Sequence, residues 1–400
     1  MQFLIPAAQM KMWLAFLGLI GGSIAIHRIL RNGWALPDVP FYLMWGMIWG
    51  PVLGFIRVAS NSPLTLNILP IAAGVILFEG GSGIPLDGLR RMWTSITSLA
   101  TLGVLIASSV LALTLHGIWQ LPWVISWMIA IVVANTDPAS VIPVLSHLSV
   151  SRKIRITLEA ESAFNDTMSA TMTSILIVAL ISHASFTGVL AQSFKQVFVG
   201  LVVGLVAGYV SGAINSKYPA INIVTALIAA LIPYLLARDL GSNGYIASFA
   251  AGLSWQIRRH SSATRVVSRL STVARIGIFS WLGLMIPLGV LQTFWPLAVG
   301  TSLILMFVAR PLTVLGSVGW ISTWRIPERL FMMWVRETGA ISAVLAIQVS
   351  TQFPLWRPPI LAIVFSSILF TVGIQAPSTG ILARMLGLVS AQKEKIPESG

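Results

Sequence analysis

The chain has 400 residues, of which 56% are apolar and only 9% are charged, and its mean hydropathy is +0.87. Soluble domains carry about 25% charged residues, so this composition excludes water as the main solvent of the chain. The net charge of +13 would suggest nucleic-acid binding only on a soluble basic domain, which the sequence lacks, and the absence of cysteine excludes disulfides and thiolate metal sites.

Apolar runs of about 20 residues recur along the chain, and each is long enough to cross a hydrocarbon core of about 30 Å. The first run, Trp13 to Leu30, has no small-residue cleavage pattern, so we expect a retained span rather than a signal peptide. We predict an all-α polytopic membrane protein with about thirteen transmembrane helices. The expected spans are residues 12–31, 40–57, 64–85, 92–115, 121–147, 154–182, 192–213, 220–237, 243–257, 271–290, 294–316, 330–350 and 358–384.

The basic residues predict the orientation, because Lys and Arg accumulate in short cytoplasmic loops. They are concentrated at alternate span ends, and the poorer set of ends holds only Lys11, Arg57, Lys195, Arg238 and Arg357. This bias predicts an external N-terminus and a cytoplasmic C-terminus. We expect an integral protein of a prokaryotic inner membrane.

Three arginines, Arg275, Arg310 and Arg336, fall within expected spans. Arg275 lies near a cytoplasmic span end, so we expect its side chain to reach the surface there. Arg310 and Arg336 lie deeper and need partners inside the protein.

No domain boundary is visible in the sequence. We expect residues 1–390 to form a single integral membrane domain, followed by a short cytoplasmic tail at 391–400. Two spans carry Pro or Gly interruptions, around Asp137 and around Gly339, one in each half of the chain. Paired interruptions are typical of inverted-repeat transporters with a site at the breaks.

Acidic residues inside spans call for a reason, because a carboxylate at mid-bilayer costs at least about 2.5 kcal/mol on insertion scales. Those that fall in expected spans are Glu79, Asp137, Glu159, Glu161, Asp166 and Glu337.

The expected span at 154–182 holds three of these carboxylates, and Asp166 should lie about 18 Å from its start, near the membrane centre. At about 100° per residue, Glu159, Ser162 and Asp166 share one helix face, while Glu161 and Asn165 share another. We therefore expect Asp166 to be functional. Glu159 has a second interpretation, in which it only stabilises the helix N-terminus.

The preceding span contains Asn135, Thr136, Asp137 and Pro138, and the proline should break the helix by removing a main-chain donor. The freed carbonyls and the Thr136 hydroxyl are hard oxygen ligands, suited to Na+ beside a cavity. Taken alone, the motif also fits an Asx or Ser/Thr turn with a plain proline kink.

The expected span at 330–350 contains the second interruption, from Arg336 to Ser342. Opposed half-helices present positive and negative dipole ends, which Asp137 and Arg336 would balance. A local pair between Arg336 and Glu337 is the alternative.

Two further charges extend the predicted site. A buried guanidinium without a carboxylate is unfavourable, and we take Glu161 as the partner of Arg310. Glu79 is followed by two glycines that permit a bend or a close approach, and its side chain is expected to reach the site. The histidines form no metal-binding motif, and we expect no cofactor.

These residues resemble the monovalent cation:proton antiporter family of the NhaP type. The resemblance rests on residues 77–81, 135–138, 161–166 and 336–342 and on Arg310, in an order and spacing that cover most of the chain. It implies thirteen helices, with a dimerisation part and a six-helix core near residues 92–182 and 294–384, in which two interrupted helices cross. It also implies a homodimer.

By position, the resemblance implies that Asp166 binds the cation or the proton, with Ser162, Thr136 and Glu79 as further ligands. It implies that Glu161 and Arg310 form a structural ion pair with Asn165 beside it. Electrogenic relatives have two adjacent aspartates where this chain has Asn165 and Asp166, so electroneutral one-for-one exchange is implied. The twelfth helix departs from the family pattern at Glu337 and Thr338, which leaves the choice between Na+, Li+ and K+ open.

We therefore expect alternating access in which Na+ and H+ compete for Asp166. The alternatives are a K+/H+ antiporter, a Na+-coupled solute symporter of the same architecture and a passive cation channel. An intramembrane enzyme would need Ser162, His147 and Asp166 as a nucleophilic set, but the mid-helix serine has no nucleophile elbow.

Overall fold

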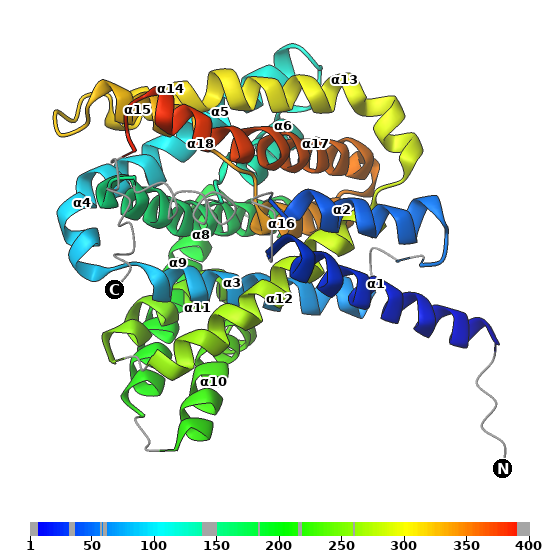
Figure 1. Cartoon of the computed structure of the whole chain (residues 1–400), viewed down its shortest axis with the longest axis horizontal. Helices are drawn as coiled ribbons and strands as arrows, with labels where there is room; N and C mark the ends of the chain where they lie inside the picture. Colours follow the sequence, from blue (N-terminus) through cyan, green and yellow to red (C-terminus); the bar gives the residue numbers. More distant parts are fainter. Residues whose placement is uncertain are drawn as a thin grey trace, which may run out of the picture.

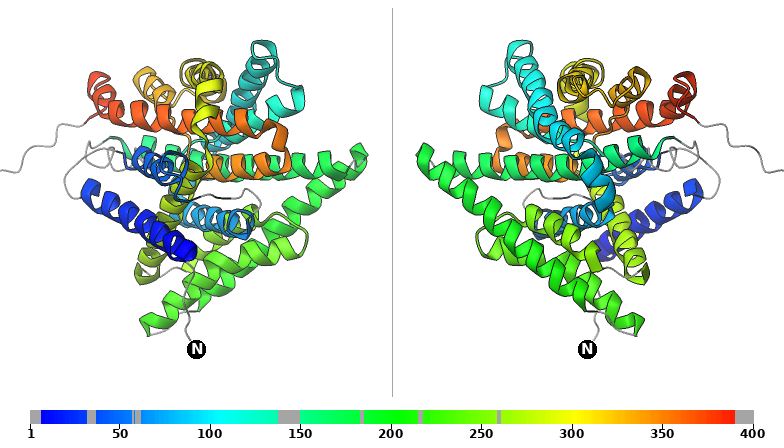
Figure 2. Two further views of the ribbon diagram at one scale, coloured as in Figure 1. Left: turned by 90° about the vertical axis from the view of Figure 1, so that its right-hand side faces the viewer. Right: turned by 90° about the vertical axis from the view of Figure 1, so that its left-hand side faces the viewer.

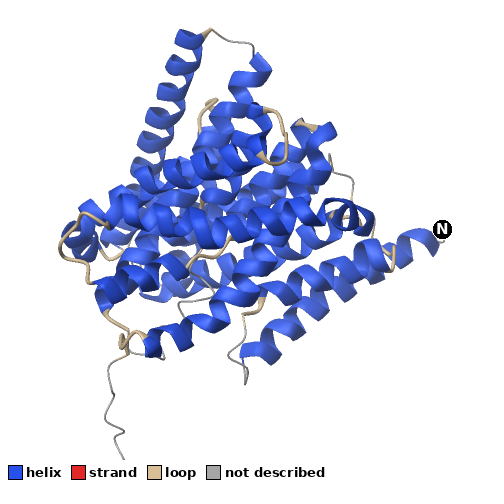
Figure 3. Cartoon of the chain, turned by 90° about the horizontal axis from the view of Figure 1, so that it is seen from above, coloured by secondary structure: helices blue, strands red, loops and turns tan. Residues whose placement is uncertain are grey.

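The computed structural model describes residues 7–31, 37–56, 58, 62–137, 150–182, 185–214, 218–258 and 261–389. Within these ranges all regular structure is helical apart from an isolated bridge between Val150 and Val389 (Figure 3). The predicted all-α class is confirmed.

The helices pack as two groups (Figures 1 and 2). In the first group, α11 packs against α3 and α9, and α12 packs against α2 and α3. This group consists of α1 (Ala7–Arg31), α2 (Val39–Met47) with a π-helical turn at Ile48–Val52, a π-helical turn at Leu64–Ile68 leading into α3 (Leu69–Gly83), α9 (Phe186–Ala213), α10 (Pro219–Asp239), α11 (Gly244–Trp255) and α12 (Ser261–Met285).

In the second group, α13 packs against α17, and α6 packs against α5 and α8. Its members from the first half of the chain are α4 (Leu86–Ser98), α5 (Val104–Gly117), α6 (Trp123–Ala134) and α8 (Arg152–Ser182). Those from the second half are α13 (Leu288–Ile304), α14 (Arg310–Val318), α15 (Ile326–Trp334), α16 (Ala340–Gln352), α17 (Arg357–Phe370) and α18 (Ala376–Met385). π-Helical turns at Leu99–Gly103, Leu305–Ala309 and Thr371–Gln375 join α4 to α5, α13 to α14 and α17 to α18. A long helix, an interrupted helix and another long helix thus follow one another twice in the chain.

The boundary between the groups is formed by α8 and α16 on one side and α3, α11 and α12 on the other. Small residues let the helices approach closely there, because a Cβ on Gly80 of α3 would lie 3.3 Å from the Cβ of Ala163 of α8. The centre of α8 therefore lies directly against the first group.

In the described part of the chain, seven helical segments are long and apolar enough to cross a membrane by themselves: Leu64–Gly83, Leu86–Gly117, Arg152–Ile181, Thr187–Ala213, Ala220–Asp239, Leu288–Val318 and Pro354–Met385. Shorter apolar helices occupy Leu17–Leu30, Trp123–Ala134 and Ala340–Gln352. The last two belong to the spans that the sequence predicts to be interrupted.

Both predicted interruptions are present. α6 ends at Ala134 and continues as extended chain through Asn135, while α15 and α16 are separated by non-helical residues 335–339. Residues 138–149, which include Pro138 and His147, lie outside the described residues. The two breaks meet, since the Asp137 amide donates to the Glu337 carbonyl oxygen at 2.8 Å.

Candidate functional site

Four of the buried polar side chains in the middle of α8 form two pairs on different faces of the helix. Glu161 and Asn165 are 0% and 2% exposed, and Ser162 and Asp166 are 5% and 6% exposed. Within each of these two pairs, the residues are one helical turn apart, so they lie on the same side of α8, as the sequence predicts. The two faces contact different partners.

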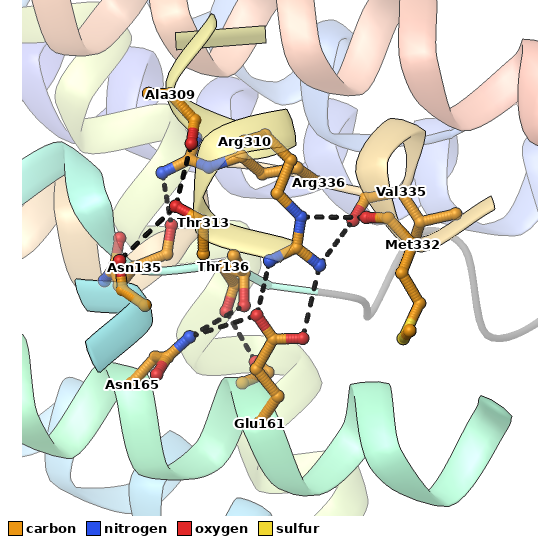
Figure 4. Close-up of polar contacts among 12 residues, drawn as sticks. Asn135, Thr136, Glu161, Asn165, Ala309, Arg310, Thr313, Met332, Val335 and Arg336 are labelled. Carbon is orange, nitrogen blue, oxygen red and sulfur yellow. Dashed lines mark hydrogen bonds and ion pairs between the residues drawn. The ribbon is translucent and has the colours of Figure 1, made fainter. Parts of the chain in front are cut away.

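Ser162 and Asp166 face the end of α6. The Ser162 hydroxyl donates to the Thr136 carbonyl oxygen at 2.5 Å, and the Asn135 amide donates to Asp166 Oδ1 at 2.9 Å. The Thr136 hydroxyl accepts a long hydrogen bond from Asn165 at 3.5 Å (Figure 4). The break in α6 thus brings main-chain and side-chain oxygens next to the Asp166 carboxylate.

The second break holds the first one in place. The Arg336 guanidinium donates to the carbonyl oxygens of Val133 and Asn135, the latter at 3.1 Å, at the C-terminal end of α6. The Ser342 hydroxyl donates to Asn135 Oδ1, which fixes the amide that contacts Asp166. A cation at a helix C-terminus stabilises the free carbonyls and the negative end of the helix dipole, which is the part predicted for Arg336.

Asp137 lies at the start of α16, at the positive end of that helix dipole. A Cβ added to Gly339, the residue before α16, would lie 2.2 Å from the Asp137 Cβ. Only glycine permits this approach of the two breaks. Asp137 therefore takes the position predicted for it at the crossing.

Glu161 and Arg310 form an ion pair with 1% of each side chain exposed. Arg310 Nη1 and Nη2 donate to the two Glu161 oxygens at 2.5 and 3.2 Å. The guanidinium also donates to the carbonyl oxygens of Met332 and Val335 at the end of α15, at 2.9 and 3.1 Å (Figure 4). One arginine thereby ties α14, α8 and α15 together, with Asn165 at 3.4 Å from Glu161.

Arg275 turns toward the site with 23% of its side chain exposed, whereas the sequence led us to expect it at the surface and gave it no partner. Its Nη1 donates to both Asp137 oxygens at 3.0 Å, and its Nη2 lies 3.5 Å from Glu79 Oε2. The site therefore contains the Arg275 guanidinium of α12, from the first group, which was not predicted as a site member. The position of Arg275 inside an expected span could have indicated a buried partner. Its place near the cytoplasmic end of that span instead led us to expect the side chain at the surface.

Two further contact residues, Asn135 and Ser342, were missed as site residues although both lie in motifs singled out in the sequence. The other residues predicted as site members lie around the two breaks and the middle of α8, with Glu79 turned toward Arg275. No group of three or more His, Cys, Asp and Glu suited to a metal ion occurs among the described residues. The oxygens of Asp166, Thr136 and Ser162 are instead the hard ligands that suit an alkali cation.

A family model described as "Sodium/hydrogen exchanger, transmembrane" matches residues 13–385. The chain belongs to this family. The match spans both helix groups and every residue of the site, and it confirms the resemblance to cation:proton antiporters.

Relatives of this exchanger-family chain are named for either of two cations. It is 28% identical over 288 residues to "K(+)/H(+) antiporter NhaP2" of Shewanella sp. (strain ANA-3), covering 69% of this chain and 50% of that protein. It is 27% identical over 366 residues to "Na(+)/H(+) antiporter 1" of Methanocaldococcus jannaschii, covering 86% of this chain and 84% of that protein. The chain spans about half the length of the Shewanella relatives.

The fold is similar to the solved structure of the sodium proton antiporter MjNhaP1 from Methanocaldococcus jannaschii at pH 8, with a TM-score of 0.80 at 25% identity. The similarity covers 92% of this chain and 99% of that one. The arrangement described above is therefore the architecture of a solved member of this class.

Proposed function

We propose that the chain is a secondary transporter that exchanges Na+ for H+, with both ions competing for Asp166. The observation that carries the proposal is the buried Asp166 carboxylate beside the Thr136 carbonyl and the Ser162 hydroxyl. Such oxygens replace the hydration shell of an alkali cation, while a proton neutralises the same carboxylate. The similarity to MjNhaP1 over nearly its whole length supports Na+ as the substrate.

Competition at one carboxylate accounts for coupled exchange. Asp166 holds a cation together with Thr136 and Ser162, or it holds a proton, and only the occupied carrier changes its access. Asn165 stands next to Asp166 where a second carboxylate would add a second exchangeable charge, so the exchange is one-for-one and electroneutral. Glu161, Arg310, Asn165, Asp137 and Arg336 support the site without carrying the ion.

Glu79 can act as a cation ligand only if its present partner, Arg275, moves. Its carboxylate faces the Arg275 guanidinium, so a role as a fourth cation ligand requires that guanidinium to move away. The described geometry favours Asp166, Thr136 and Ser162 as the ligand set.

We propose that the transporter works as a homodimer in a prokaryotic inner membrane, with the N-terminus outside and the C-terminus in the cytoplasm. The first helix group supplies the dimerisation part, and the second group supplies the moving core. Alternating access then moves the second group against the first, as in other inverted-repeat transporters. The transported Na+ and H+ are the only ions or small molecules that the mechanism needs.

K+/H+ exchange is the second candidate, favoured by the Shewanella relatives that are named K(+)/H(+) antiporters. Glu337 and Thr338 lie in the crossing and depart from the usual sequence of the family. A changed shape at the crossing would alter the oxygen spacing around the cation and hence its preferred size.

Purified protein in liposomes tests the proposal. An inside-acidic pH gradient is monitored with a pH-sensitive dye, a permeant anion holds the voltage near zero, and Na+, Li+ or K+ is added outside. We expect Na+ to dissipate the gradient in the wild type and in the exposed-carboxylate control Asp239→Asn, but not in Asp166→Asn. A response to K+ alone identifies the second candidate, and no response to any cation in folded protein overturns both.

A further inference from the structure

Arg275 is the charged connection between the two helix groups. It extends from α12 of the first group to Asp137 of the second, and its Nη1 donates to both carboxylate oxygens at 3.0 Å. Among ion pairs between described residues, it alone joins the groups, whereas the pairs of Lys153, Arg155 and Arg310 stay within the second group. Relative motion of the groups therefore has to stretch or break this contact.

The second partner of Arg275 behaves differently. Glu79 belongs to α3, which packs directly against α12 within the first group, and its Oε2 lies 3.5 Å from Arg275 Nη2. This partner stays beside Arg275 when the second group moves. The Arg275 guanidinium thus keeps its contact with Glu79 when the groups move, and it loses its contact with Asp137.

A guanidinium with two such partners forms a switch. When Asp137 moves away, Arg275 retains Glu79, so the break does not leave the guanidinium unpaired in a protein interior, which would be strongly unfavourable. The side chains of Arg275, Glu79 and Asp137 are 23%, 28% and 12% exposed, so the exchange of partners occurs at a site that is only partly closed.

We propose that Arg275 is a latch that sets the balance between the conformations of the transporter: its pair with Asp137 holds the two groups in the described arrangement, and its pair with Glu79 releases them. The inference rests on the proposed function only in assuming that the groups move against each other. Arg275 is a positioning residue in this scheme, because it acts on the arrangement of the groups rather than on the transported ion.

The latch predicts opposite effects for its two carboxylates. Asp137→Asn removes the holding partner and should depopulate the described arrangement. Glu79→Gln removes the releasing partner and should populate it further. Arg275→Gln should resemble Asp137→Asn, and Glu79→Gln should have no effect once Arg275 is already Gln.

A disulfide across the boundary measures the population directly. The chain has no cysteine, and the Cβ positions of Gly80 and Ala163 lie 3.3 Å apart, close to the separation found in disulfides. The double substitution Gly80→Cys and Ala163→Cys, combined with each latch variant, is equilibrated in glutathione buffers without Na+, Li+ or K+. The oxidised fraction gives the effective concentration of the two thiols, which does not depend on how fast either thiol reacts.

We expect the effective concentration to fall roughly threefold or more in Asp137→Asn and Arg275→Gln and to rise by a similar factor in Glu79→Gln. Arg275→Lys keeps the charge but pairs with one carboxylate at a time, so its effective concentration should lie between those of the wild type and Arg275→Gln. This variant replaces Arg275→Gln in the comparison if Arg275→Gln does not fold. Changes of the same sign in Glu79→Gln and Asp137→Asn overturn the latch, as does an unchanged value in Arg275→Lys and Arg275→Gln.

The assay separates this inference from the proposed function because it uses no transported cation. A chain that shows the opposite shifts but no cation-driven proton flux retains the latch and loses the exchange proposal. A chain that exchanges Na+ for H+ without those shifts retains the exchange proposal and loses the latch.

Discussion

Two helix contacts in this protein are built on opposite principles. Along the contact of α9 with α11, Gly200, Gly204, Gly208 and Gly212 follow at intervals of four residues, and a Cβ on each would lie 2.8, 2.2, 2.1 and 2.9 Å from a carbonyl oxygen on or next to α11. At the boundary between the groups, Arg275 instead reaches Asp137 through an ion pair.

The difference lies in what each contact permits. Close backbone packing through glycine is a matter of shape, and sliding by a fraction of a turn would bring side chains into collision. An ion pair with a second partner within reach exchanges its contacts without a steric barrier. The chain thus uses fixed glycine packing between α9 and α11 within the first group, and it adds an exchangeable pair at Arg275 to the contact between the groups.

The largest expected effect sharpens the contrast between ion pairs within and between groups. Arg310→Ala leaves Glu161 as an uncompensated charge at 1% exposure, and it should lower the free energy of unfolding by about 3–5 kcal/mol. Arg275→Ala removes the guanidinium from Asp137 and Glu79, whose side chains are 12% and 28% exposed and can be partly hydrated, so it should cost less, about 1–3 kcal/mol. Thermal unfolding in detergent compares the two variants.

Equal losses of stability in these two arginine variants would mean that the boundary pair is as structural as the internal one. The distinction between fixed and exchangeable contacts would then fail.

The glycine contact provides the second test. Gly208→Ala places a methyl group 2.1 Å from the Ala251 carbonyl oxygen and 2.2 Å from the Ser254 hydroxyl, so α9 and α11 must separate. We expect a loss of about 1–3 kcal/mol in the free energy of unfolding, in the range found for overpacked cores.

Gly21→Ala is the matched control for the glycine substitution, because no atom lies within 4 Å of the added Cβ and alanine favours the helix. It should leave the unfolding temperature unchanged or raise it slightly. Because alanine favours a helix over glycine, a similar loss in both variants would show that the loss does not come from the contact between α9 and α11.

Much of this arrangement follows from the sequence. The 100° periodicity of α8 correctly separates the Ser162 and Asp166 face from the Glu161 and Asn165 face, and the need of a buried guanidinium for a carboxylate brings Arg310 to Glu161. The two breaks follow from Pro138, which removes a main-chain donor, and from the polar interruption between Arg336 and Ser342.

Other features could not be predicted from one sequence, because they depend on distances between segments far apart in the chain. Arg275 lies 138 residues from Asp137, and only the packing of α12 decides that it turns inward rather than toward the surface. The first turns of α4 were missed because Asp87, Arg90 and Arg91 make them polar, so that hydropathy places the helix start late.

A smaller effect tests how the second break supports the first. Ser342→Ala removes the donor to Asn135 Oδ1 and frees the amide that contacts Asp166. One neutral hydrogen bond contributes about 1 kcal/mol, so we expect the apparent KM for Na+ to rise by roughly fivefold with little loss of stability.

Ser378→Ala is the control for Ser342→Ala, since the Ser378 hydroxyl contacts neither Asn135 nor Asp166. It accepts a hydrogen bond from Trp334 Nε1 and donates to the Ile374 and Gln375 carbonyl oxygens. Ser378→Ala should leave the apparent KM unchanged. The same KM in both variants would show that Asn135 keeps its orientation without Ser342.

The smallest expected effect concerns Glu159, which shares a helix face with Asp166 but lies nearer the N-terminus of α8. Its Oε1 accepts a hydrogen bond from Arg155 Nε at 3.0 Å, in an i,i+4 pair whose side chains are 48% and 21% exposed. Exposed helical pairs of this kind contribute about 0.3–0.5 kcal/mol, so Glu159→Gln should lower the unfolding temperature only slightly, and less at high salt. If Glu159→Gln instead changes the apparent KM for Na+ severalfold at unchanged stability, Glu159 belongs to the ion path, which then extends about two turns along α8 from Asp166 toward the helix N-terminus.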